Sequence, residues 1–230
     1  MVKTVIITGA SGNLGKATVN KMLTEGYRVI AVSHSNNNFE FVRGTALFEQ
    51  HSVDLSNEAA SSAFVDDLIS RFTNIDAALL LAGGYAMGDI NNTGGDELKR
   101  MYSLNFETAF YIAMPVFRHM LTTGNGRIIL VGARPALVAS QGKNTIAYAL
   151  SKSLLFKLSE LLNEEAKGKN VVSAVIVPGI IDTDSNRQAM PEADFEKWVS
   201  AEQIADLILF ICSNQGMAQR EAVYKMYHNS

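Results

Sequence analysis

Two residues with the chemistry of proton transfer, Tyr148 and Lys152, stand four positions apart in a stretch whose apolar spacing predicts a helix. Side chains at this separation project from the same face of a helix. The spacing alone also fits an ordinary amphipathic pair. As a functional pair, the ammonium would favour the ionised phenol and lower its pKa from about 10. Because a proton donor works best with a pKa near the operating pH, we interpret Tyr148 as a candidate general acid.

A glycine-rich turn follows the first apolar run of the chain. Gly9, Gly12 and Gly15 are spaced three apart between a predicted strand and a predicted helix. Glycines there let the backbone bend tightly and let a phosphate approach, and the helix that follows directs its free N–H groups and positive dipole end at that phosphate. Lys16 is followed by Ala17, so the turn lacks the ending of a P-loop. The pattern favours a bound nucleotide without triphosphate chemistry, although such turns also occur as purely structural features.

Strands and helices are predicted to alternate along the chain. The predicted strands are residues 2–8, 27–33, 45–53, 75–82, 127–131, 171–177 and 222–227. The predicted helices are residues 13–25, 56–72 with Ser56 as N-cap, 96–119 with a bend near Pro115, 145–166 and 201–212. This alternation predicts an α/β protein with a single domain over residues 1–230, a Rossmann fold with a doubly wound, mostly parallel seven-stranded sheet.

Ligands of such sheets bind at the carboxyl ends of the strands. The loops after residues 8, 33, 54, 82, 131 and 177 therefore form the expected site. Residues 184–199 are predicted as loop with short helix, and this segment is a candidate lid. Arg127, at the opposite end of its strand, is interpreted as solvated charge.

Composition and charge narrow the possible partners. The 230 residues are 47% hydrophobic and 19% charged, which is a globular composition, and the formal net charge is −3. With no long basic run, neither nucleic acid nor a membrane surface is expected as a partner. The histidines His34, His51, His119 and His228 suggest no metal site, and the single Cys212 is expected to pack in the core. No signal segment or membrane-spanning run is recognised, which favours a cytoplasmic protein.

Six elements follow one another along the chain: Thr8-Gly9 with the glycine turn, Asp54, Ala82-Gly83, Asn105, Tyr148-x-x-x-Lys152 and Pro178-Gly179-x-x-x-Thr183. This is the order found in short-chain dehydrogenases/reductases, and the chain resembles that family. The pattern covers residues 2–183 and, with the last helix and strand, nearly the whole chain. Six ordered elements are far more specific than any one of them, so the resemblance favours the functional interpretation of Tyr148 and Lys152.

The resemblance implies a nicotinamide dinucleotide cofactor. It implies that Tyr148 donates a proton, that Lys152 holds the ribose hydroxyls and lowers the pKa of Tyr148, and that Asn105 supports a water relay to Lys152. The implied cofactor contacts also include Gly9, Ser11, Gly12, Asn13, Leu14 and Gly15 around the pyrophosphate, Asp54 and Leu55 at the adenine, Ala82, Gly83, Gly84, Pro178 and Gly179, and Ile180 and Thr183 at the carboxamide.

The chain departs from the family pattern at three places. The glycines read Gly-x-x-Gly-x-x-Gly rather than Gly-x-x-x-Gly-x-Gly, and Leu81 stands where an Asn is usual. The Ser that orients the substrate is expected after residues 127–131, where the chain has Gly132-Ala133-Arg134. Ser140 is a substitute only if the loop folds back. Loss of such a hydrogen-bond donor often costs roughly 10²–10³ in rate.

These departures resemble the dihydropteridine reductase-like members of the family, which also lack the Ser. The similarity lies in residues 81–85, 132–137 and 186–195. A dihydropterin is reduced at a conjugated, imine-like system. It therefore depends less on a Ser that holds a carbonyl group than an isolated ketone does. Met and aromatic residues pack in the core more often than they line a pocket. With that alternative open, the candidate pocket walls are Tyr85, Ala133, Met190 and Trp198.

Cofactor choice depends on the end of the second strand. An acid there would bind the ribose 2′-hydroxyl of NAD, whereas this chain has Ser33, with no acid before Glu40 and no Arg before Arg43. The lack of a repelling acid favours NADPH, and NADH stays open. Either cofactor could accept hydrogen bonds from Ser33, His34, Ser35 and Asn36.

The sequence therefore predicts an NAD(P)H-dependent short-chain oxidoreductase that acts on a small molecule, with a dihydropterin-like substrate as the favoured interpretation. A carbonyl or quinone reductase of the same family is an alternative, and so is an NADP-binding sensor without catalysis. The family resemblance also implies a homodimer or homotetramer. Its expected interface is formed by the helices over residues 96–119 and 145–166.

Overall fold

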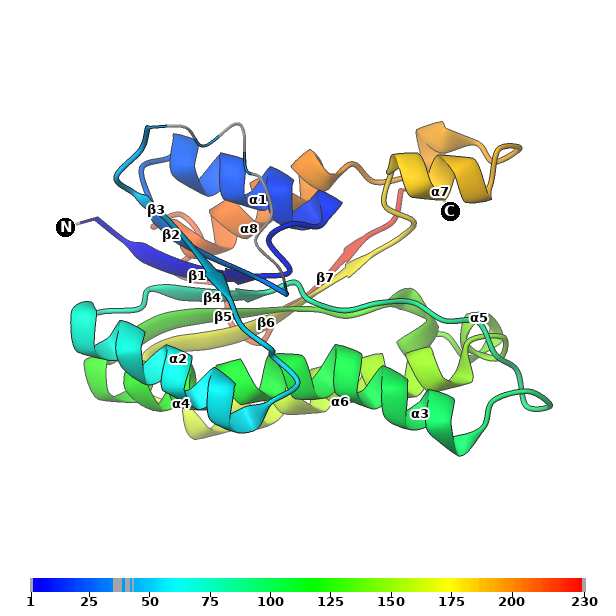
Figure 1. Cartoon of the computed structure of the whole chain (residues 1–230), viewed down its shortest axis with the longest axis horizontal. Coiled ribbons are helices and arrows are strands. Elements are labelled where there is room, and N and C mark those ends of the chain that lie inside the picture. The colour runs from blue at the N-terminus through cyan, green and yellow to red at the C-terminus, as the bar shows by residue number, and fades with distance from the viewer. Residues whose placement is uncertain (1, 35–38, 40–41, 43, 229–230) are drawn as a thin grey trace.

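A seven-stranded sheet runs through the middle of the protein in this computed structural model, which describes residues 2–34, 39, 42 and 44–228 (Figure 1). The strand order is β3-β2-β1-β4-β5-β6-β7, and every neighbouring pair is parallel. The predicted Rossmann fold is confirmed, and its sheet is parallel throughout. The strands are β1 (Thr4–Thr8), β2 (Arg28–Ser33), β3 (Phe48–Ser52), β4 (Ala77–Leu80), β5 (Asn125–Val131), β6 (Asn170–Pro178) and β7 (Val223–Met226).

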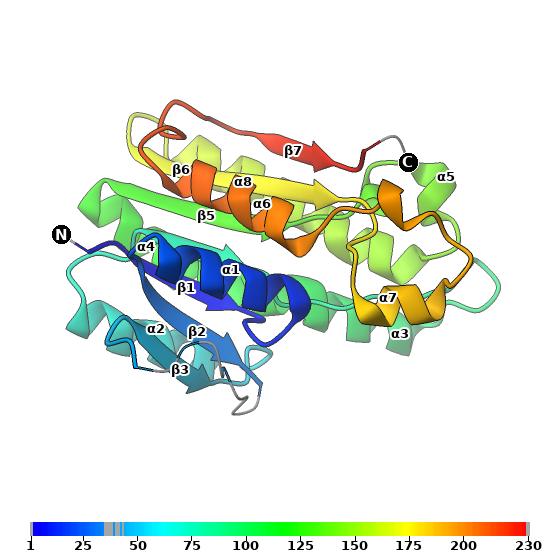
Figure 2. The same ribbon diagram turned by 90° about the horizontal axis from the view of Figure 1, so that it is seen from above.

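Helices cover both faces of this sheet. Alternate side chains of β1 enter different cores, because Ile6 packs in one cluster and Val5 and Ile7 in the other. Burial on both faces explains why the strands read as continuous apolar runs. Cys212 is buried, as predicted. Figures 1 and 2 show α1 (Asn13–Thr24) beside α8 (Ala201–Cys212) on one face, and α2 (Glu58–Arg71), α4 (Thr108–Thr123) and α6 (Ile146–Glu165) on the other.

The long helix predicted over residues 96–119 is interrupted, and the interruption is not at Pro115. Helix α3 (Gly95–Tyr102) leads into a π-helical turn, Ser103–Glu107, from which α4 continues. The N–H that follows this turn bonds to the carbonyl five residues back, so the turn accommodates one extra residue. Pro115 lies inside α4, where buried neighbours hold the helix together. The π turn places Asn105 in the interior, where it is fully buried.

Segments predicted as loops contain short helices. Residues 132–143 include a 3₁₀ turn (Arg134–Ala136) and α5 (Ala139–Gly142), and residues 184–199 include α7 (Asp184–Ala189) and a second 3₁₀ turn (Phe195–Lys197). A parallel bridge between Ile181 and Val199 closes the base of the α7 segment. In the part of the chain that the structure describes, no helix is both long and apolar enough to span a membrane.

Arg127 is buried, which corrects its interpretation as solvated charge. At the start of β5 its guanidinium donates to Asn170 O at 2.9 Å and to Asn170 Oδ1 at 3.0 Å. The pKa of Arg127 is lowered, mainly by burial and to a smaller extent by the positive charge of Arg220. The charge is tolerated because the neighbouring strand supplies oxygens for it.

The start of α2 also differs from the prediction. Asn57, not Ser56, is the N-cap, and its side-chain oxygen accepts the Ala60 N–H at 3.0 Å. Ser56 instead donates its hydroxyl to Asp54 Oδ1 at 2.6 Å. Both residue types suit an N-cap, and the sequence places them side by side.

The substitution Asn57→Ala is expected to lower the free energy of unfolding by about 1 kcal/mol, because one N–H of the first turn of α2 loses its acceptor. Ser56→Ala is the matched control and should cost clearly less, since its hydroxyl does not cap the helix. Urea denaturation followed by far-ultraviolet circular dichroism measures both values. A larger loss for Ser56→Ala than for Asn57→Ala would contradict the assignment of the cap.

Candidate active site

The glycine turn after β1 packs tightly against the segment that follows β4. Gly9 has a φ of 64°, in the region that favours glycine, and a Cβ there would lie 2.8 Å from the Ala82 nitrogen. A Cβ on Gly15 would lie 2.1 Å from Gly9 O. The Thr8 hydroxyl accepts the Ala82 N–H at 3.2 Å and joins the two loops. The structure therefore requires glycine at positions 9 and 15.

The N-terminus of α1 opens from this turn. Gly12 is its N-cap and provides no side-chain hydrogen bond, and the first turn of the helix holds no acidic residue. Ser11, Asn13 and Leu14 are half-buried or exposed around it. Free N–H groups and the dipole at such a helix start attract an anion, so the turn fits a phosphate group.

Lys152 and Asn105 meet beside Gly83, at the carboxyl edge of the sheet. Lys152 is 6% exposed, and its Nζ donates to Val131 O, at the end of β5, at 2.9 Å. A Cβ on Gly83 would lie 2.7 Å from Asn105 Oδ1 and 3.1 Å from Lys152 Nζ. Both polar atoms therefore approach the same point of the backbone. Tyr148 lies one turn earlier on α6, so the three predicted catalytic residues belong to one region of the structure.

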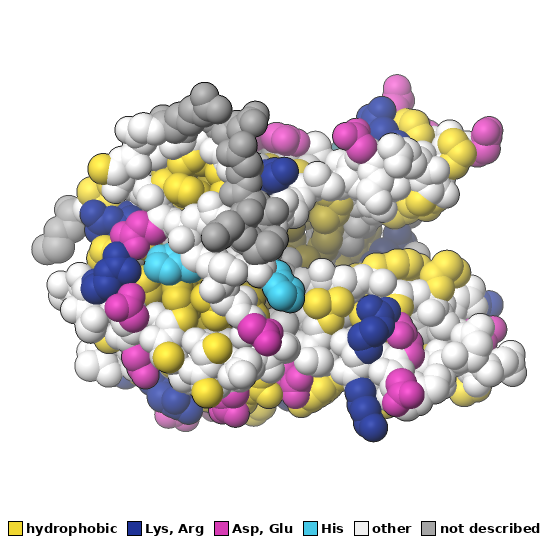
Figure 3. All heavy atoms as spheres, in the orientation of Figure 1, with side chains coloured by type: hydrophobic (Ala, Val, Ile, Leu, Met, Phe, Trp, Pro, Cys, Tyr) yellow, Lys and Arg dark blue, Asp and Glu magenta, His cyan; other side chains and the backbone are white. Residues whose placement is uncertain are grey.

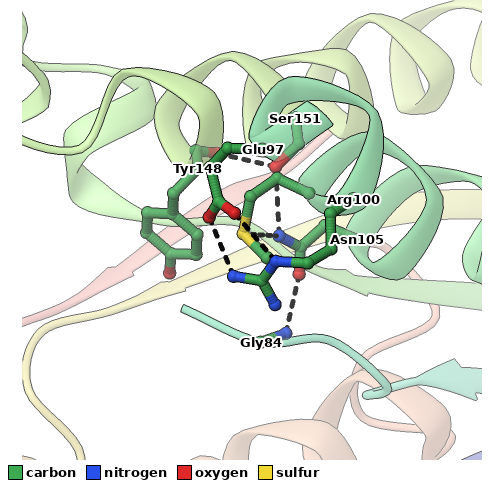
Figure 4. A network of polar contacts seen from close by, with 7 residues as sticks. Gly84, Glu97, Arg100, Asn105, Tyr148 and Ser151 are labelled. Atoms are coloured by element: carbon green, nitrogen blue, oxygen red, sulfur yellow. Dashed lines mark hydrogen bonds and ion pairs between the residues drawn. The ribbon is translucent and has the colours of Figure 1, made fainter. Parts of the chain in front are cut away.

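Asn105 is held from both ends of its amide (Figure 4). Its Oδ1 accepts the Gly84 N–H at 2.9 Å, and its Nδ2 donates to Ser151 Oγ at 3.0 Å. The Ser151 hydroxyl donates in turn to the carbonyl oxygen of Tyr148 at 2.8 Å. Ser151 has no predicted role, and its place directly before Lys152 is the one signal in the sequence that points to it.

Burial governs the ionisation of Tyr148 and Lys152. The pKa of Tyr148 is raised to about 12, mainly by burial and to a smaller extent by the neighbouring Tyr85 phenol. Burial lowers the pKa of Lys152 to about 8. In the chain alone, burial therefore dominates the pKa of Tyr148, and the lowering of this pKa by Lys152 stays a prediction. The Nζ of Lys152 is bonded to the Val131 carbonyl, and desolvation dominates the ionisation of the phenol.

Tyr85, a candidate pocket wall, contacts Tyr148 directly. The two rings meet edge-on with centroids 5.1 Å apart, and Tyr85 is 61% exposed. Ala133 and Trp198 are buried, and Trp198 packs against Phe195 with ring centroids 4.7 Å apart. Figure 3 shows the surface hollowed between the segment that carries α7 and the layer that carries α5. Tyr85 is thus the most accessible of these three side chains, and all three stay candidates as pocket walls.

The predicted contacts for the adenosine end of a cofactor lie after β2 and β3. Ser33 is buried at the end of β2, and His34 is exposed after it. Hydrogen bonds from the side chain and backbone of Ser56 lower the pKa of the exposed Asp54, and Leu55 is buried. The described residues do not include Ser35, Asn36, Glu40 and Arg43.

The predicted contacts for the nicotinamide end follow β6. Pro178 is the last residue of β6, and the Gly179 N–H donates to the backbone of β7 at 2.8 Å. Ile180 is 43% exposed, and Thr183 is the N-cap of α7. Met190, another candidate pocket wall, follows α7 and is half-buried. These residues bring the base of the α7 segment to the same edge as the glycine turn.

The sequence matches the family model described as short chain dehydrogenase over residues 3–194. The chain belongs to this family. As a short-chain dehydrogenase it is an oxidoreductase, which confirms the predicted enzyme class. The resemblance seen in the sequence is thereby confirmed at the level of the family.

Two reductases and one solved structure illustrate what this short-chain dehydrogenase is similar to. A 3-oxoacyl-(acyl-carrier-protein) reductase FabG from Buchnera aphidicola is 24% identical over 226 residues, with 93% of this chain and 91% of the relative covered. An acetoacetyl-CoA reductase from Acinetobacter is 22% identical, with 93% and 92% covered. The solved structure of ElxO with NADP bound has a TM-score of 0.89 at 18% identity, covers 98% of this chain and 97% of its own, and shows the shared fold. These three do not show the dihydropteridine reductase-like subgroup.

The buried ammonium of Lys152 has a consequence for stability that can be measured. Its pKa is about 8 in the folded chain and 10.5 when unperturbed, so between these values the unfolded chain binds more protons and stability rises with pH. Relative to Lys152→Met, the wild type should gain about 2 kcal/mol of unfolding free energy between pH 7 and pH 9.5.

Chemical denaturation of both proteins at the two pH values measures this gain. Lys169→Met, at an exposed lysine, is the control and should keep the pH dependence of the wild type. A Lys152→Met variant whose stability changes with pH in parallel with the wild type would show that Lys152 is not desolvated.

Proposed function

We propose that this short-chain dehydrogenase is an NADPH-dependent reductase in which Tyr148 donates a proton to a small-molecule substrate. The observation that carries the proposal is the meeting of Asn105 Oδ1 and Lys152 Nζ beside Gly83, one helical turn from Tyr148. This cluster stands at the carboxyl edge of a parallel sheet, where such folds bind ligands. In this proposal residues 1–230 act as one dinucleotide-binding domain.

The residues at this edge fit a dinucleotide cofactor. The turn has no room for a side chain at Gly9 or Gly15 and ends at the uncapped start of α1, which suits a pyrophosphate. Ser33 ends β2 without an acid that would repel a 2′-phosphate, and ElxO, of the same fold, was solved with NADP bound. These features support NADP, with NAD as the alternative. The residues that would hold it further along are Asp54, Leu55, Gly179, Ile180 and Thr183.

The nicotinamide supplies the hydride when the cofactor is bound, and the chain supplies placement and the proton. With a pKa of about 12, the Tyr148 hydroxyl is protonated at neutral pH and is in its donor form. Lys152, with a pKa of about 8, is mostly charged at pH 7. Its charge would stabilise the phenolate that remains after proton transfer. The oxygen of Asn105 would face that charge across Gly83.

For the substrate we propose a conjugated, imine-like compound of the dihydropterin type. Ala133 lies in the loop where the family resemblance implies a Ser, and its methyl group donates no hydrogen bond to a carbonyl. Tyr85 presents a 61% exposed ring beside Tyr148, on which a flat heterocycle can stack. The names of the two reductases above support the alternative, a carbonyl substrate, and a quinone is a second alternative. A sensor that binds NADP without turnover is the third.

The exposed apolar face of α3 and α6 supports a homodimer or homotetramer. The two helices pack together and leave a groove of about 670 Å³. Apolar side chains gathered in one groove mark an interaction surface. We also propose a cytoplasmic location, which is a point separate from the groove. The exposed apolar residues of this groove are Leu98, Tyr102, Leu150 and Leu154.

Light scattering after size-exclusion chromatography tests the oligomer. The wild type is expected at two or four times the mass of one chain, and Leu154→Glu should shift it towards one chain, because a carboxylate would be buried without a partner. A wild type with the mass of a single chain would overturn this part of the proposal.

The substitution Tyr148→Phe is expected to lower kcat at least about 10²-fold, because it removes the proton donor and little else. Tyr224→Phe, on the edge strand β7, is the matched control and should keep full activity. Oxidation of NADPH and of NADH is followed with a quinonoid dihydropterin, a quinone and a 3-oxo compound as acceptors. Thermal stabilisation by NADPH should be equal in both variants and the wild type.

The outcomes separate the alternatives. Turnover with a quinone or 3-oxo compound alone would replace the dihydropterin by that class. Stabilisation by NADPH without turnover on any acceptor would favour the sensor. A wild type that neither cofactor stabilises would overturn the proposal as a whole.

A further inference from the structure

Ser151 occupies a buried position between two residues of the site. Its side chain is 1% exposed, its hydroxyl donates to Tyr148 O at 2.8 Å, and its oxygen accepts from Asn105 Nδ2 at 3.0 Å (Figure 4). We propose that Ser151 is a positioning residue that fixes the orientation of the Asn105 amide and so aims its oxygen at the backbone point shared with Lys152. The structural part of this inference concerns the chain alone, and its catalytic part rests on the function proposed above.

The direction of the hydrogen bonds follows from the chemistry of each group. A serine hydroxyl carries one proton, and here that proton is donated to the Tyr148 carbonyl, so the lone pairs of Oγ face Asn105. A lone pair selects the NH₂ end of the amide. At the other end, the Gly84 N–H is a donor and selects the oxygen. Both contacts therefore require the same orientation of the Asn105 amide. Gly84 donates to Asn105, Asn105 donates to Ser151, and Ser151 donates to Tyr148.

The orientation matters because of what lies across Gly83. A Cβ on Gly83 would touch both Asn105 Oδ1 and Lys152 Nζ, so the amide end that points there is an electrostatic neighbour of the buried ammonium. An oxygen carries partial negative charge and favours the ammonium, whereas an NH₂ group would oppose it. With Ser151 removed, the thioether sulfur of Met101, 3.7 Å from Nδ2, is a weak acceptor and holds the amide poorly.

The same helix offers a matched control. Ser153 donates its hydroxyl to Leu150 O, three residues back, in the same way that Ser151 donates to Tyr148 O. The hydrogen bond of Ser153 is exposed, and Asn105 Nδ2 donates to Ser151 instead. Substitution of either residue by Ala therefore removes the same kind of local bond, and the loss of the bond to Asn105 is specific to Ser151.

The first experiment needs neither cofactor nor substrate. Hydrogen exchange of the Gly84 amide is measured by ¹⁵N nuclear magnetic resonance in the wild type, Ser151→Ala and Ser153→Ala. Loss of the fixed acceptor should speed exchange at Gly84 about tenfold in Ser151→Ala and leave Ser153→Ala unchanged. The neighbouring Ala82 amide, bonded to the Thr8 hydroxyl, is the internal control for general loosening of the loop.

Unchanged exchange at Gly84 in Ser151→Ala would overturn the structural part of the inference, and so would equal acceleration at Gly84 and Ala82. If Ser151→Ala does not fold, Ser151→Cys takes its place, because a thiol is a weaker acceptor of similar size and should accelerate Gly84 exchange in the same direction. Ser151→Thr keeps the hydroxyl and should restore the slow exchange of the wild type.

The second experiment tests the effect on the reaction with the acceptor that the wild type turns over. Ser151→Ala should lower kcat about tenfold with little change in KM for NADPH, and Ser151→Thr should recover most of the activity. In an Asn105→Ala background, Ser151→Ala should have no further effect, because its action passes through Asn105. Losses that multiply in the double variant would show that Ser151 acts by another route. A wild type without turnover would count against the proposed function, and the exchange experiment would still decide the structural part.

Discussion

Burial of the Lys152 ammonium is the constraint on which the arrangement of this site depends. An amine that is 6% exposed has lost most of its hydration and is tolerated where oxygen atoms face it. The Val131 carbonyl is one such oxygen, and Asn105 Oδ1 lies near it across Gly83. The two oxygens come from places where regular structure stops, the end of β5 and the π turn. The missing Cβ at Gly83 lets all of these groups approach one another.

Most of the fold could be predicted from the sequence, because it follows from local pattern. β1 is fully buried on both faces and therefore consists of apolar and β-branched residues without alternation. The π turn could not be predicted, because Ser103–Glu107 has ordinary helical composition and contacts from distant residues hold Asn105 inward. Pro115 is the opposite case, since a residue that disfavours helices is held inside α4 by the packing of its neighbours.

Helical spacing places Tyr148 and Lys152 on one face of a helix, and the order of the family motifs favours their functional interpretation. Their ionisation depends on burial, which spacing does not reveal. The burial of Arg127 is hidden from the sequence for the same reason, because a charged residue is usually exposed and the Asn170 oxygens that compensate its charge are distant in sequence. Serine is common in helices, and the partner of Ser151 is 46 residues away. For each of these residues the sequence shows the type of side chain, but not the residues that surround it in the fold.

The groove between α3 and α6 lies next to the hydrogen bonds of Asn105. Ser103 and Ser151 line this groove, so one side of the π turn faces the groove and Asn105 bonds to Gly84 on the other. Ser151 is excluded from solvent in the single chain, with an exposure of 1%, and both of its hydrogen bonds are to residues of the same chain. Association through the groove would cover apolar side chains such as Leu154 without supplying an atom to this network. The orientation of Asn105 is therefore a property of the single chain, and a partner that covers the groove can stabilise the π turn but is not needed to set it.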